Sequence, residues 1–353
     1  MKRTWSYPAL RDLPVRRILV IKLRAIGDIL LSTIVLRNLR HAFPDARIDM
    51  LVEPPAQDIV ERHPALDGVV LFAAGKDSPL HVFRSLRRAH YDLVFDLFCN
   101  PRSAQFTFVS GAAVRVGYPF RGRSWAYNVH VTSRADRVHN TEFNLDALSA
   151  VGIPIIDRSV TIDVPKEDSA WAQEYTAELR QNNRMLVALN PSGTWESKRW
   201  PAEYFAALVD MLTERRNARV ILLWGPGEEQ TARSILAMTH SDAVVPPSTS
   251  LIRLAALLSA CDAMITNDTG PMHIGAAVGI PVLGIFGPTN PLLQGPYNTR
   301  STWVRREGLT CLGCNRTVCP IGKTCMTDLK PEVVFEAFAA LLPESHGKGT
   351  PDA

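Results

Sequence analysis

Long hydrophobic runs are missing from this sequence. Residues 1–17 are polar and broken by prolines, unlike the apolar core of a signal peptide, and no later stretch reaches the roughly 18 uninterrupted apolar residues of a membrane span. We therefore expect a cytoplasmic protein. With 353 residues and 46% hydrophobic composition, the chain is long enough to form two domains that each have a core.

Common phosphate-binding motifs are absent as well. No Gly-x-Gly-x-x-Gly follows the first predicted strand and no Walker A motif occurs, so neither a dinucleotide nor a P-loop triphosphate site is expected in the first half. The chain also lacks any Asp-x-Asp pair, the usual carboxylate holder of a nucleotide-bound cation. Any nucleotide chemistry is therefore expected to need no divalent metal.

Excess charge is small. The formal net charge of +4 is too low to indicate a nucleic-acid partner by itself. Arginines nevertheless crowd the first half, at Arg84, Arg87, Arg88, Arg102, Arg115, Arg121, Arg123, Arg134 and Arg137. This pattern fits either a solvated basic face or contact with an acidic substrate or an anionic membrane surface.

Short buried strands alternate with helical segments along the chain. In the first half, strands are predicted at 18–23, 48–52, 68–72 and 93–97, helices at 29–42, 56–63 and 79–90, and a loop-rich segment at 100–128. In the second half, strands are predicted at 185–189, 219–223, 263–265 and 280–286, and helices at 202–214, 228–239, 250–259 and 331–342. Such alternation predicts an α/β fold with parallel sheets and helices on both faces.

A change of pattern marks the expected domain boundary. Pro165 breaks the chain, a charged helix is predicted at 166–179, and Gln181-Asn182-Asn183 ends it. We predict a first domain over 1–164, a linker region over 165–184 and a second domain over 185–353, with a closing helix at 331–342.

The stretch 267–291, NDTGPMHIGAAVGIPVLGIFGPTNP, has a clear functional pattern. It predicts a strand, a turn, a helix that begins at Thr269 and Gly270, and a second strand. Free backbone N–H groups at a helix start attract an anion, Asp268 could bind hydroxyl groups, and His273 lies one turn further on. A phosphorylated polyol is therefore the expected ligand. The alternative is that Asp268 or Thr269 only caps the helix.

Polar clusters also follow other predicted strands, at 192–198 and 225–229. Ligands of open α/β sheets bind beyond the carboxyl ends of the strands. The Lys198 ammonium, together with the hydroxyls of Ser192 and Thr194, could bind a diphosphate. The alternative is a lysine that is simply solvated, as most loop lysines are.

The motifs together resemble a known family. ILVIKLRAIGDILLSTIVLRNLRHAFPDARID, NPSGTWESKRWP, LWGPGEE and the 267–291 stretch resemble, over nearly the whole chain, the bacterial heptosyltransferases among the GT-B glycosyltransferases. The resemblance implies two Rossmann-like domains with parallel sheets facing across a cleft. It also implies inverting transfer of heptose from ADP-heptose, bound by the second domain, to the inner core of lipopolysaccharide, bound by the first.

The resemblance also implies roles for particular residues. Asp28 matches the proposed catalytic base, although it could instead cap the helix predicted from Ile29. The donor contacts are matched by Thr194 and Lys198 for the diphosphate, Glu229 for the nucleoside, and Asp268, Thr269, Gly270 and His273 for the donor-site motif. No cofactor is expected for catalysis, because Lys198 and the helix start would offset the charge of the leaving diphosphate.

The expected partners are ADP-heptose and an anionic acceptor in the lipopolysaccharide core, with peripheral contact at the cytoplasmic face of the inner membrane and no nucleic acid. Other functions fit the same sequence. One is a transferase on this scaffold that uses another nucleotide sugar or a protein acceptor. The other is a non-catalytic module that binds a nucleotide sugar without turning it over.

A cysteine cluster at 311–325 follows the donor motif. It has the spacing C-x2-C-x4-C-x5-C and consists of Cys311, Cys314, Cys319 and Cys325. Close thiols in a cytoplasmic protein fit a structural zinc or iron site better than disulfides, and reduced structural thiols are the alternative. Cys99 and Cys261 are expected to be ordinary buried residues.

Overall fold

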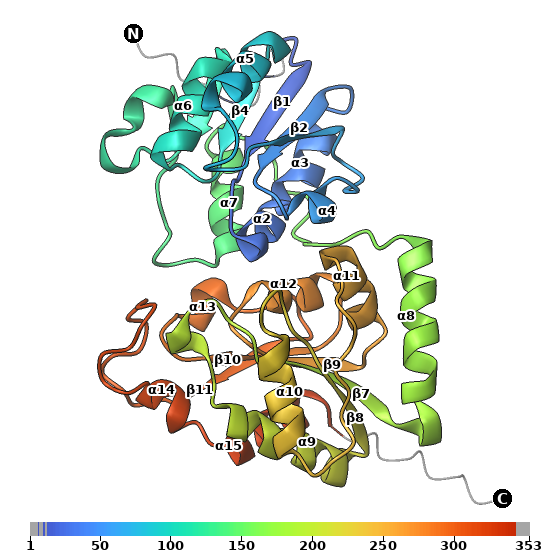
Figure 1. The fold of residues 1–353 in the computed structure, drawn as a ribbon. Coiled ribbons are helices and arrows are strands. Elements are labelled where there is room, and N and C mark those ends of the chain that lie inside the picture. Colours follow the sequence, from blue (N-terminus) through green and yellow to red (C-terminus); the bar gives the residue numbers. More distant parts are fainter. Residues whose placement is uncertain (1–5, 7–9, 11–12, 344–353) are drawn as a thin grey trace, which may run out of the picture. The chain divides into compact units, whose positions relative to one another are not determined.

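The computed structural model describes residues 6, 10 and 13–343. The chain divides into two compact units. The first unit holds the chain up to Ala170 together with the segments Thr249–Ala256 and Leu292–Tyr297, and the second holds Trp171–Ser248, Leu257–Pro291 and the chain from Asn298 onward. Each unit is built around one parallel β-sheet, with helices packed on it (Figure 1).

The first sheet has six strands in the order β3-β2-β1-β4-β5-β6. They are β1 (Arg17–Ile21), β2 (Arg47–Val52), β3 (Gly68–Leu71), β4 (Leu93–Asp96), β5 (Val114–Gly117) and β6 (Val129–His130). Helices α2 (Ile26–Ser32) and α3 (Ile34–Ala42) pack with α7 (Asn140–Ser149), and α5 (Pro79–Ala89) packs with α6 (Pro101–Ser110). The short α4 (Gln57–Val60) lies beside β3. The apolar residues of β1 are fully buried, as expected for a parallel strand covered on both faces.

The second sheet has five strands in the order β11-β10-β9-β7-β8. They are β7 (Met185–Asn190), β8 (Ala218–Leu222), β9 (Ala263–Asn267), β10 (Val282–Phe286) and β11 (Thr302–Arg305). Helix α9 (Ala202–Arg216) packs on β8 and on α10 (Glu229–Met238) and α15 (Pro331–Leu341), whereas α12 (Gly270–Ala277) packs on β9 and β10. The other helices are α8 (Lys166–Leu179), α11 (Leu251–Ser259), α13 (Pro291–Gln294) and α14 (Thr324–Thr327).

The predicted α/β fold with parallel sheets is confirmed, but the segment 100–128 is not loop-rich as expected. It contains helix α6 and strand β5. The helix starts with a capping box, in which Asn100 accepts a hydrogen bond from the Ser103 N–H and the Ser103 hydroxyl accepts one from the Asn100 N–H. Pro101 then occupies the first turn. The signal Asn-Pro-x-Ser was therefore present in the sequence, since proline and a capping pair both favour helix starts.

The helix predicted at 29–42 is also different. It begins earlier, at Ile26, and is divided into α2 and α3 at Thr33. The hydroxyls of Ser32 and Thr33 donate hydrogen bonds to the carbonyls of Ile29 and Leu30, both at 2.7 Å. Serine and threonine hydroxyls that bond back to the preceding turn tend to bend a helix, which accounts for the division.

Within the part of the chain that the structure describes, no helix combines the length and hydrophobicity needed to cross a bilayer.

Candidate functional site

The strand order of each sheet determines where a ligand can bind. In the first sheet, β1 lies between β2 and β4, and in the second, β7 lies between β9 and β8. The connections leaving β1 and β4 therefore run to opposite sides, as do those leaving β7 and β9. Open α/β sheets bind ligands at such a switch point, beyond the carboxyl ends of the strands. The predicted catalytic and donor residues follow β1, β7, β8 and β9.

In the second unit, Lys198 forms a buried ion pair. Its Nζ lies 2.6 Å from Oδ2 of Asp268, and the two side chains are only 14% and 5% exposed. The same carboxylate oxygen accepts a hydrogen bond of 2.6 Å from the Thr289 hydroxyl. Lys198 also lies 4.4 Å from the centre of the Trp195 ring. The alternative of a solvated loop lysine is therefore wrong, because the ammonium is held against β9 by a charge and an aromatic face.

Two buried asparagines connect the loop after β7 to the end of β9. The Asn190 amide donates to the Thr269 hydroxyl at 2.8 Å, and the Asn267 amide donates to the carbonyl of Pro191 at 2.8 Å. The Asn267 amide also lies 3.3 Å from the carbonyl of Ser192. These bonds fix two loops from distant parts of the sequence against each other, since buried polar groups pair where they can.

Helix α12 begins where the sequence predicted. Thr269 is its N-cap residue, Gly270 is its first residue and a proline occupies its first turn. The Thr269 side chain makes no capping hydrogen bond to the helix, and its hydroxyl donates instead to the Asn267 carbonyl at 3.2 Å. The cap interpretation of Asp268 also fails, because its carboxylate binds Lys198 and Thr289. The first N–H groups of α12 are thus left without a side-chain cap, as an anion-binding helix start requires.

The remaining predicted donor residues differ in their surroundings. His273 lies in α12 and is only 8% exposed. Thr194 is exposed on its loop. Ser192 is also 8% exposed, and within the described residues its hydroxyl has no hydrogen-bond partner. A buried hydroxyl without a partner costs free energy, so the Ser192 oxygen is a group that a ligand could satisfy.

A cavity of about 210 Å³ lies behind this loop, between the starts of α9 and α10. Its polar lining includes Ser192, Arg199, Glu228, Thr231 and Lys323. The Glu228 carboxylate accepts a hydrogen bond of 3.2 Å from the Gly193 N–H, whereas the predicted Glu229 pairs with Arg233 one turn along α10, at 2.6 Å. Glu228 is therefore an acidic residue of this site that the sequence reasoning missed.

In the first unit, Asp28 lies in the first turn of α2 and is partly buried. The N-cap residue of α2 is Ala25, so Asp28 does not cap a helix beginning at Ile29, and that alternative is wrong. The Asn140 amide of α7 lies 3.4 Å from an Asp28 carboxylate oxygen.

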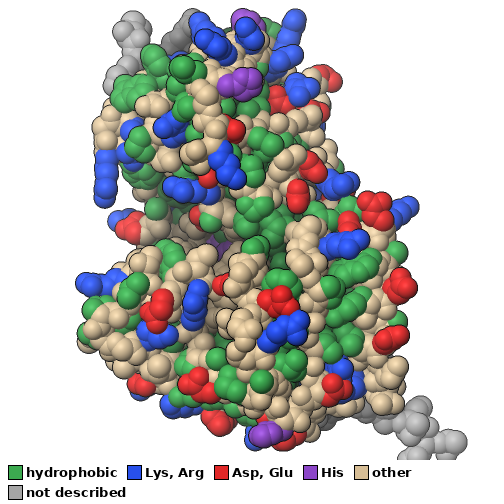
Figure 2. Space-filling model, viewed as in Figure 1, with side chains coloured by type: hydrophobic (Ala, Val, Ile, Leu, Met, Phe, Trp, Pro, Cys, Tyr) green, Lys and Arg blue, Asp and Glu red, His purple; other side chains and the backbone are tan. Residues whose placement is uncertain are grey.

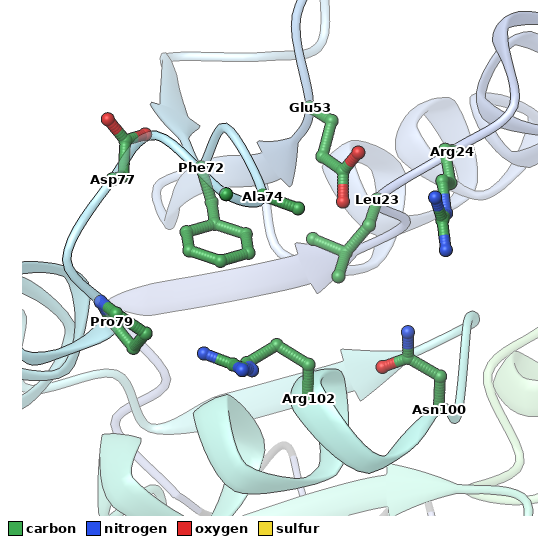
Figure 3. A pocket seen from close by; sticks show the side chains of 10 residues that line it. Leu23, Arg24, Glu53, Phe72, Ala74, Asp77, Pro79, Asn100 and Arg102 are labelled. Carbon is green, nitrogen blue, oxygen red and sulfur yellow. The ribbon is translucent and has the colours of Figure 1, made fainter.

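A second cavity, of about 410 Å³, opens in the first unit beyond the carboxyl ends of its strands (Figure 3). It is lined from the ends of β1 and β2, the loop after β3 and the start of α6, by Leu23, Arg24, Glu53, Phe72, Ala74, Gly75, Asp77, Pro79, Asn100 and Arg102. Of these residues, the sequence analysis considered only Arg102, as one of the arginines that could contact an acidic substrate or a membrane surface. The spacing of the lining residues along the chain is wide, so only the strand order brings them together.

The loop that carries the cysteine cluster is attached to the Lys198 turn. The Ser197 N–H donates to the Thr317 carbonyl at 3.1 Å, and the Ser197 hydroxyl donates to the Arg316 carbonyl at 2.5 Å. Glu196 pairs with Lys323 at 2.8 Å. The cysteine loop therefore supports the three-residue turn η4 (Glu196–Lys198) that presents the lysine.

The thiols of the cluster are free and differ in burial. Cys314 is exposed, Cys311 and Cys319 are partly buried, and Cys325 is buried. Burial, followed by the neighbouring Cys311, raises the pKa of Cys325 to about 11. Among the described residues, no group of three or more histidine, cysteine or acidic side chains is arranged as a ready metal site. Cys99 and Cys261 are both buried, as expected.

The fold and the second-unit site define a class of protein: an α/β protein with two parallel sheets, which has an uncapped helix start and a buried lysine beyond the carboxyl ends of the strands of its second sheet. The chain matches the sequence profile of glycosyltransferase family 9 (heptosyltransferase) over residues 80–325. It belongs to this family, and so is a glycosyltransferase.

Individual proteins agree with this assignment. Lipopolysaccharide heptosyltransferase 1 of Pseudomonas aeruginosa is 26% identical over 365 residues, which span 92% of this chain and 98% of that protein. A glycosyl transferase family 9 structure from Veillonella parvula superimposes with a TM-score of 0.84 at 24% identity, covering 94% of this chain and 99% of that one. This structural similarity shows that the chain has the GT-B fold.

Two further structures are of interest for their ligands. The E. coli heptosyltransferase WaaC with ADP-2-deoxy-2-fluoro heptose superimposes with a TM-score of 0.68 at 22% identity, over 92% of this chain and 99% of that one. The iron-containing dodecameric glycosyltransferase TibC from enterotoxigenic E. coli superimposes with a TM-score of 0.56 at 15% identity, over 92% and 78% of the two chains.

Proposed function

We propose that this protein transfers heptose, with inversion at the anomeric carbon, from ADP-heptose to the inner core of lipopolysaccharide. The observation that carries the proposal is the Lys198–Asp268 pair beside the uncapped start of α12. A cation and free N–H groups at one place suit the diphosphate of a nucleotide sugar. The heptosyltransferase named above that was solved with an ADP-heptose analogue supports this donor.

The proposed reaction is a single displacement. An acceptor hydroxyl attacks the anomeric carbon of heptose, the bond from that carbon to the diphosphate oxygen breaks, and ADP leaves with the electron pair. Asp28 accepts the proton of the hydroxyl, because an alcohol is a poor nucleophile until its proton is removed. Lys198 and the N–H groups of Thr269 and Gly270 stabilise the negative charge that grows on the diphosphate.

The other donor contacts are proposed by position. Ser192 and Thr194 would bind the diphosphate, Glu229 the nucleoside, and Asp268 and His273 the heptose. Glu228, which faces the Ser192 loop, joins Glu229 as a candidate for the ribose hydroxyls. We assign the acceptor to the domain over 1–164 and the donor to the domain over 185–353, with 165–184 as linker.

No divalent metal is required in this mechanism, because Lys198 and the α12 start supply the positive charge. Excess EDTA should therefore leave the transfer rate unchanged. A rate that is lost to EDTA and restored by magnesium would contradict the proposal.

We further propose that Cys311, Cys314, Cys319 and Cys325 bind a structural zinc or iron ion. The sulfur-only donor set and the free state of the thiols support this, and TibC is an iron-containing relative in fold. The ion would hold the loop that supports the Lys198 turn. Elemental analysis of untagged protein tests the proposal, and less than about a tenth of an equivalent of any transition metal would end it.

A peripheral membrane contact and a cytoplasmic location complete the proposal. Phe108 and Trp125 are 52% and 51% exposed, and their rings meet edge to face at 5.3 Å. Arg115 lies 5.8 Å from the Phe108 ring, and Arg121 is exposed nearby in sequence. Elsewhere, Lys and Arg side chains are scattered over the face seen in Figure 2. Aromatic rings beside arginines suit an anionic lipid surface, so Phe108→Ser with Trp125→Ser should reduce sedimentation with anionic vesicles.

The decisive experiment for the function is release of ADP from ADP-heptose, with and without isolated inner-core acceptor. Acceptor-dependent release and a heptosylated product are expected. Release from a different nucleotide sugar would favour another transferase of this scaffold. Binding of ADP-heptose, detected as a raised melting temperature, without turnover of any donor would favour a non-catalytic binding module.

A further inference from the structure

The proposed base has a polar neighbour to which the mechanism above gives no role. Asn140 is the first residue of helix α7, and α7 packs against α2, the helix that holds Asp28 (Figure 1). The Asn140 amide donates to Oδ1 of the Asp28 carboxylate at 3.4 Å. Within the described residues, Oδ2 of Asp28 has no hydrogen bond and can face an acceptor hydroxyl. A catalytic base is commonly oriented by such a third group.

A histidine fixes the start of α7. His139 is the N-cap residue, and its Nδ1 accepts a hydrogen bond of 3.2 Å from the Thr141 N–H. On the other side of the ring, Nε2 lies 3.0 Å from the carbonyl oxygen of Gly295, which can only accept. Nε2 therefore carries the hydrogen, and Nδ1 is the acceptor. Burial lowers the pKa of His139, which keeps the ring neutral in this arrangement.

The segment that His139 binds, Leu292–Tyr297, comes from the connection between β10 and β11 and belongs to the first unit. The Tyr297 and His139 rings stack with their centres 4.9 Å apart, and the Tyr297 hydroxyl donates to the Glu142 carboxylate at 3.1 Å. Glu142 also pairs with Arg158. An asparagine or serine would suffice to cap a helix. The histidine does more, because it joins the first turn of α7 to a segment from a distant part of the sequence.

We propose that Asn140 and His139 are positioning residues for the base. Asn140 orients the Asp28 carboxylate, and His139 holds Asn140 in place by joining the start of α7 to the 292–297 segment. This inference rests on the proposed function, because it needs Asp28 to accept the proton. A base must come within about 3 Å of the group that it deprotonates. A misplacement of about 1 Å can reduce a rate about a hundredfold.

Asn140→Ala is the direct test. Because the base is then less often in place, kcat should fall about tenfold, while the KM values for ADP-heptose and for acceptor stay within about twofold of the parent. Asn140→Gln, which keeps an amide donor on a longer side chain, should recover part of kcat. Gln57→Ala is the matched control. It removes an amide–carboxylate bond of 2.9 Å, to Glu61, from the first residue of α4 in the same unit, and should leave kcat unchanged.

His139→Asn tests the histidine. Asparagine is a good N-cap residue, so this variant keeps a cap for the Thr141 N–H and loses the contacts with Gly295 and Tyr297. We expect kcat to fall about fivefold with little change in either KM. If His139 acts through Asn140, the double variant with Asn140→Ala should lose no more than Asn140→Ala alone. A lower melting temperature with an unchanged kcat would overturn the role of His139, since it would show only a contribution to the fold.

The Asp28→Asn enzyme supplies the decisive comparison. Once the base is removed, Asn140→Ala should reduce the residual rate no further. Losses that multiply, or an Asn140→Ala enzyme with a kcat within about twofold of an active parent, would overturn the inference alone. A parent enzyme that releases no ADP from ADP-heptose with any acceptor would overturn the proposed function, and this inference with it. If Asn140→Ala does not fold, Asn140→Ser, whose hydroxyl is too short to reach Asp28, takes its place with the same expected loss.

Discussion

The carboxyl ends of the two sheets are built in opposite ways. In the second unit, Lys198, Asp268 and Thr289 satisfy one another, and Asn190 and Asn267 fix the surrounding loops. In the first unit, Arg24 and Arg102 line an open cavity together with Glu53 and Asp77 but form no ion pair among the described residues. Asp28 has one long contact, to Asn140 at 3.4 Å.

The difference fits the two substrates proposed for the halves. A leaving diphosphate has one geometry in every turnover, and groups that are already oriented stabilise it without reorganising. An acceptor is larger and carries several charged groups. Charged side chains that form no ion pair within the protein can pair with these groups when the acceptor binds. The comparison predicts that changes in the second unit affect donor chemistry, and changes in the first affect the acceptor or proton transfer.

Asp28→Asn should have the largest effect. Loss of a general base should reduce kcat about a hundredfold to ten-thousandfold, with the KM for ADP-heptose and the melting temperature nearly unchanged. Asp58→Asn is a matched control, since Asp58 is an exposed acidic residue in the first turn of α4. An Asp28→Asn enzyme that transfers heptose within about threefold of the parent at saturating acceptor is not compatible with this base.

Lys198→Ala should reduce the transfer rate on the order of a hundredfold, because the leaving diphosphate loses its cation. The change also leaves Asp268 buried beside Thr289 without its positive partner, so the melting temperature should fall as well. Rates must be measured well below that melting temperature. Lys198→Arg should recover part of the rate. Lys330→Ala, at an exposed lysine of the same unit that bonds to Tyr204 and Thr327, should leave the rate unchanged. Equal rates in Lys198→Ala and Lys330→Ala would remove the lysine from the mechanism.

Ser197→Ala tests whether the cysteine loop positions the donor lysine. The change removes the hydroxyl bond to the Arg316 carbonyl but keeps the N–H bond to the Thr317 carbonyl. One lost hydrogen bond of about 1 kcal/mol should raise the KM for ADP-heptose about fivefold and leave the acceptor KM unchanged. Ser234→Ala removes a similar hydroxyl bond, to the Gln230 carbonyl, on the exposed face of α10 and is the control. A purely structural Ser197 would lower the melting temperature without this selective change in KM.

Thiol labelling compares the rates at which the buried and the exposed cysteines react, and it should have the smallest effect on the protein. Burial raises the pKa of Cys99 above its usual range and that of Cys261 to about 12, so neither should react with iodoacetamide in the native protein near neutral pH. The exposed Cys314 should react first. If the cluster binds a metal, its labelling should require a chelator. Mass spectrometry of labelled peptides gives the order, and native labelling of Cys99 at the Cys314 rate would contradict the burial described here.

The sequence by itself determined the order of the strands and helices that it predicted, and the helix start at Gly270, but it did not predict β6, α7 or β11. Buried parallel strands are short, continuous apolar runs, and Thr-Gly-Pro marks the start of the helix at 270. Both patterns are local, so they can be recognised in the sequence. The segment 100–128 was misread because arginines and glycines obscured the capping pair at the start of α6.

Only the tertiary structure decided which side chains meet. Lys198 pairs with Asp268, which lies 70 residues later in the sequence. Helix α10 begins at Glu229, so the residue before it, Glu228, bonds to the Ser192 loop, whereas Glu229 points along the helix to Arg233. The residues that line the first-unit cavity, among them Arg24, Glu53, Phe72 and Arg102, form no sequence motif. They lie on separate connections, which meet because parallel strands place their carboxyl ends at one edge of the sheet.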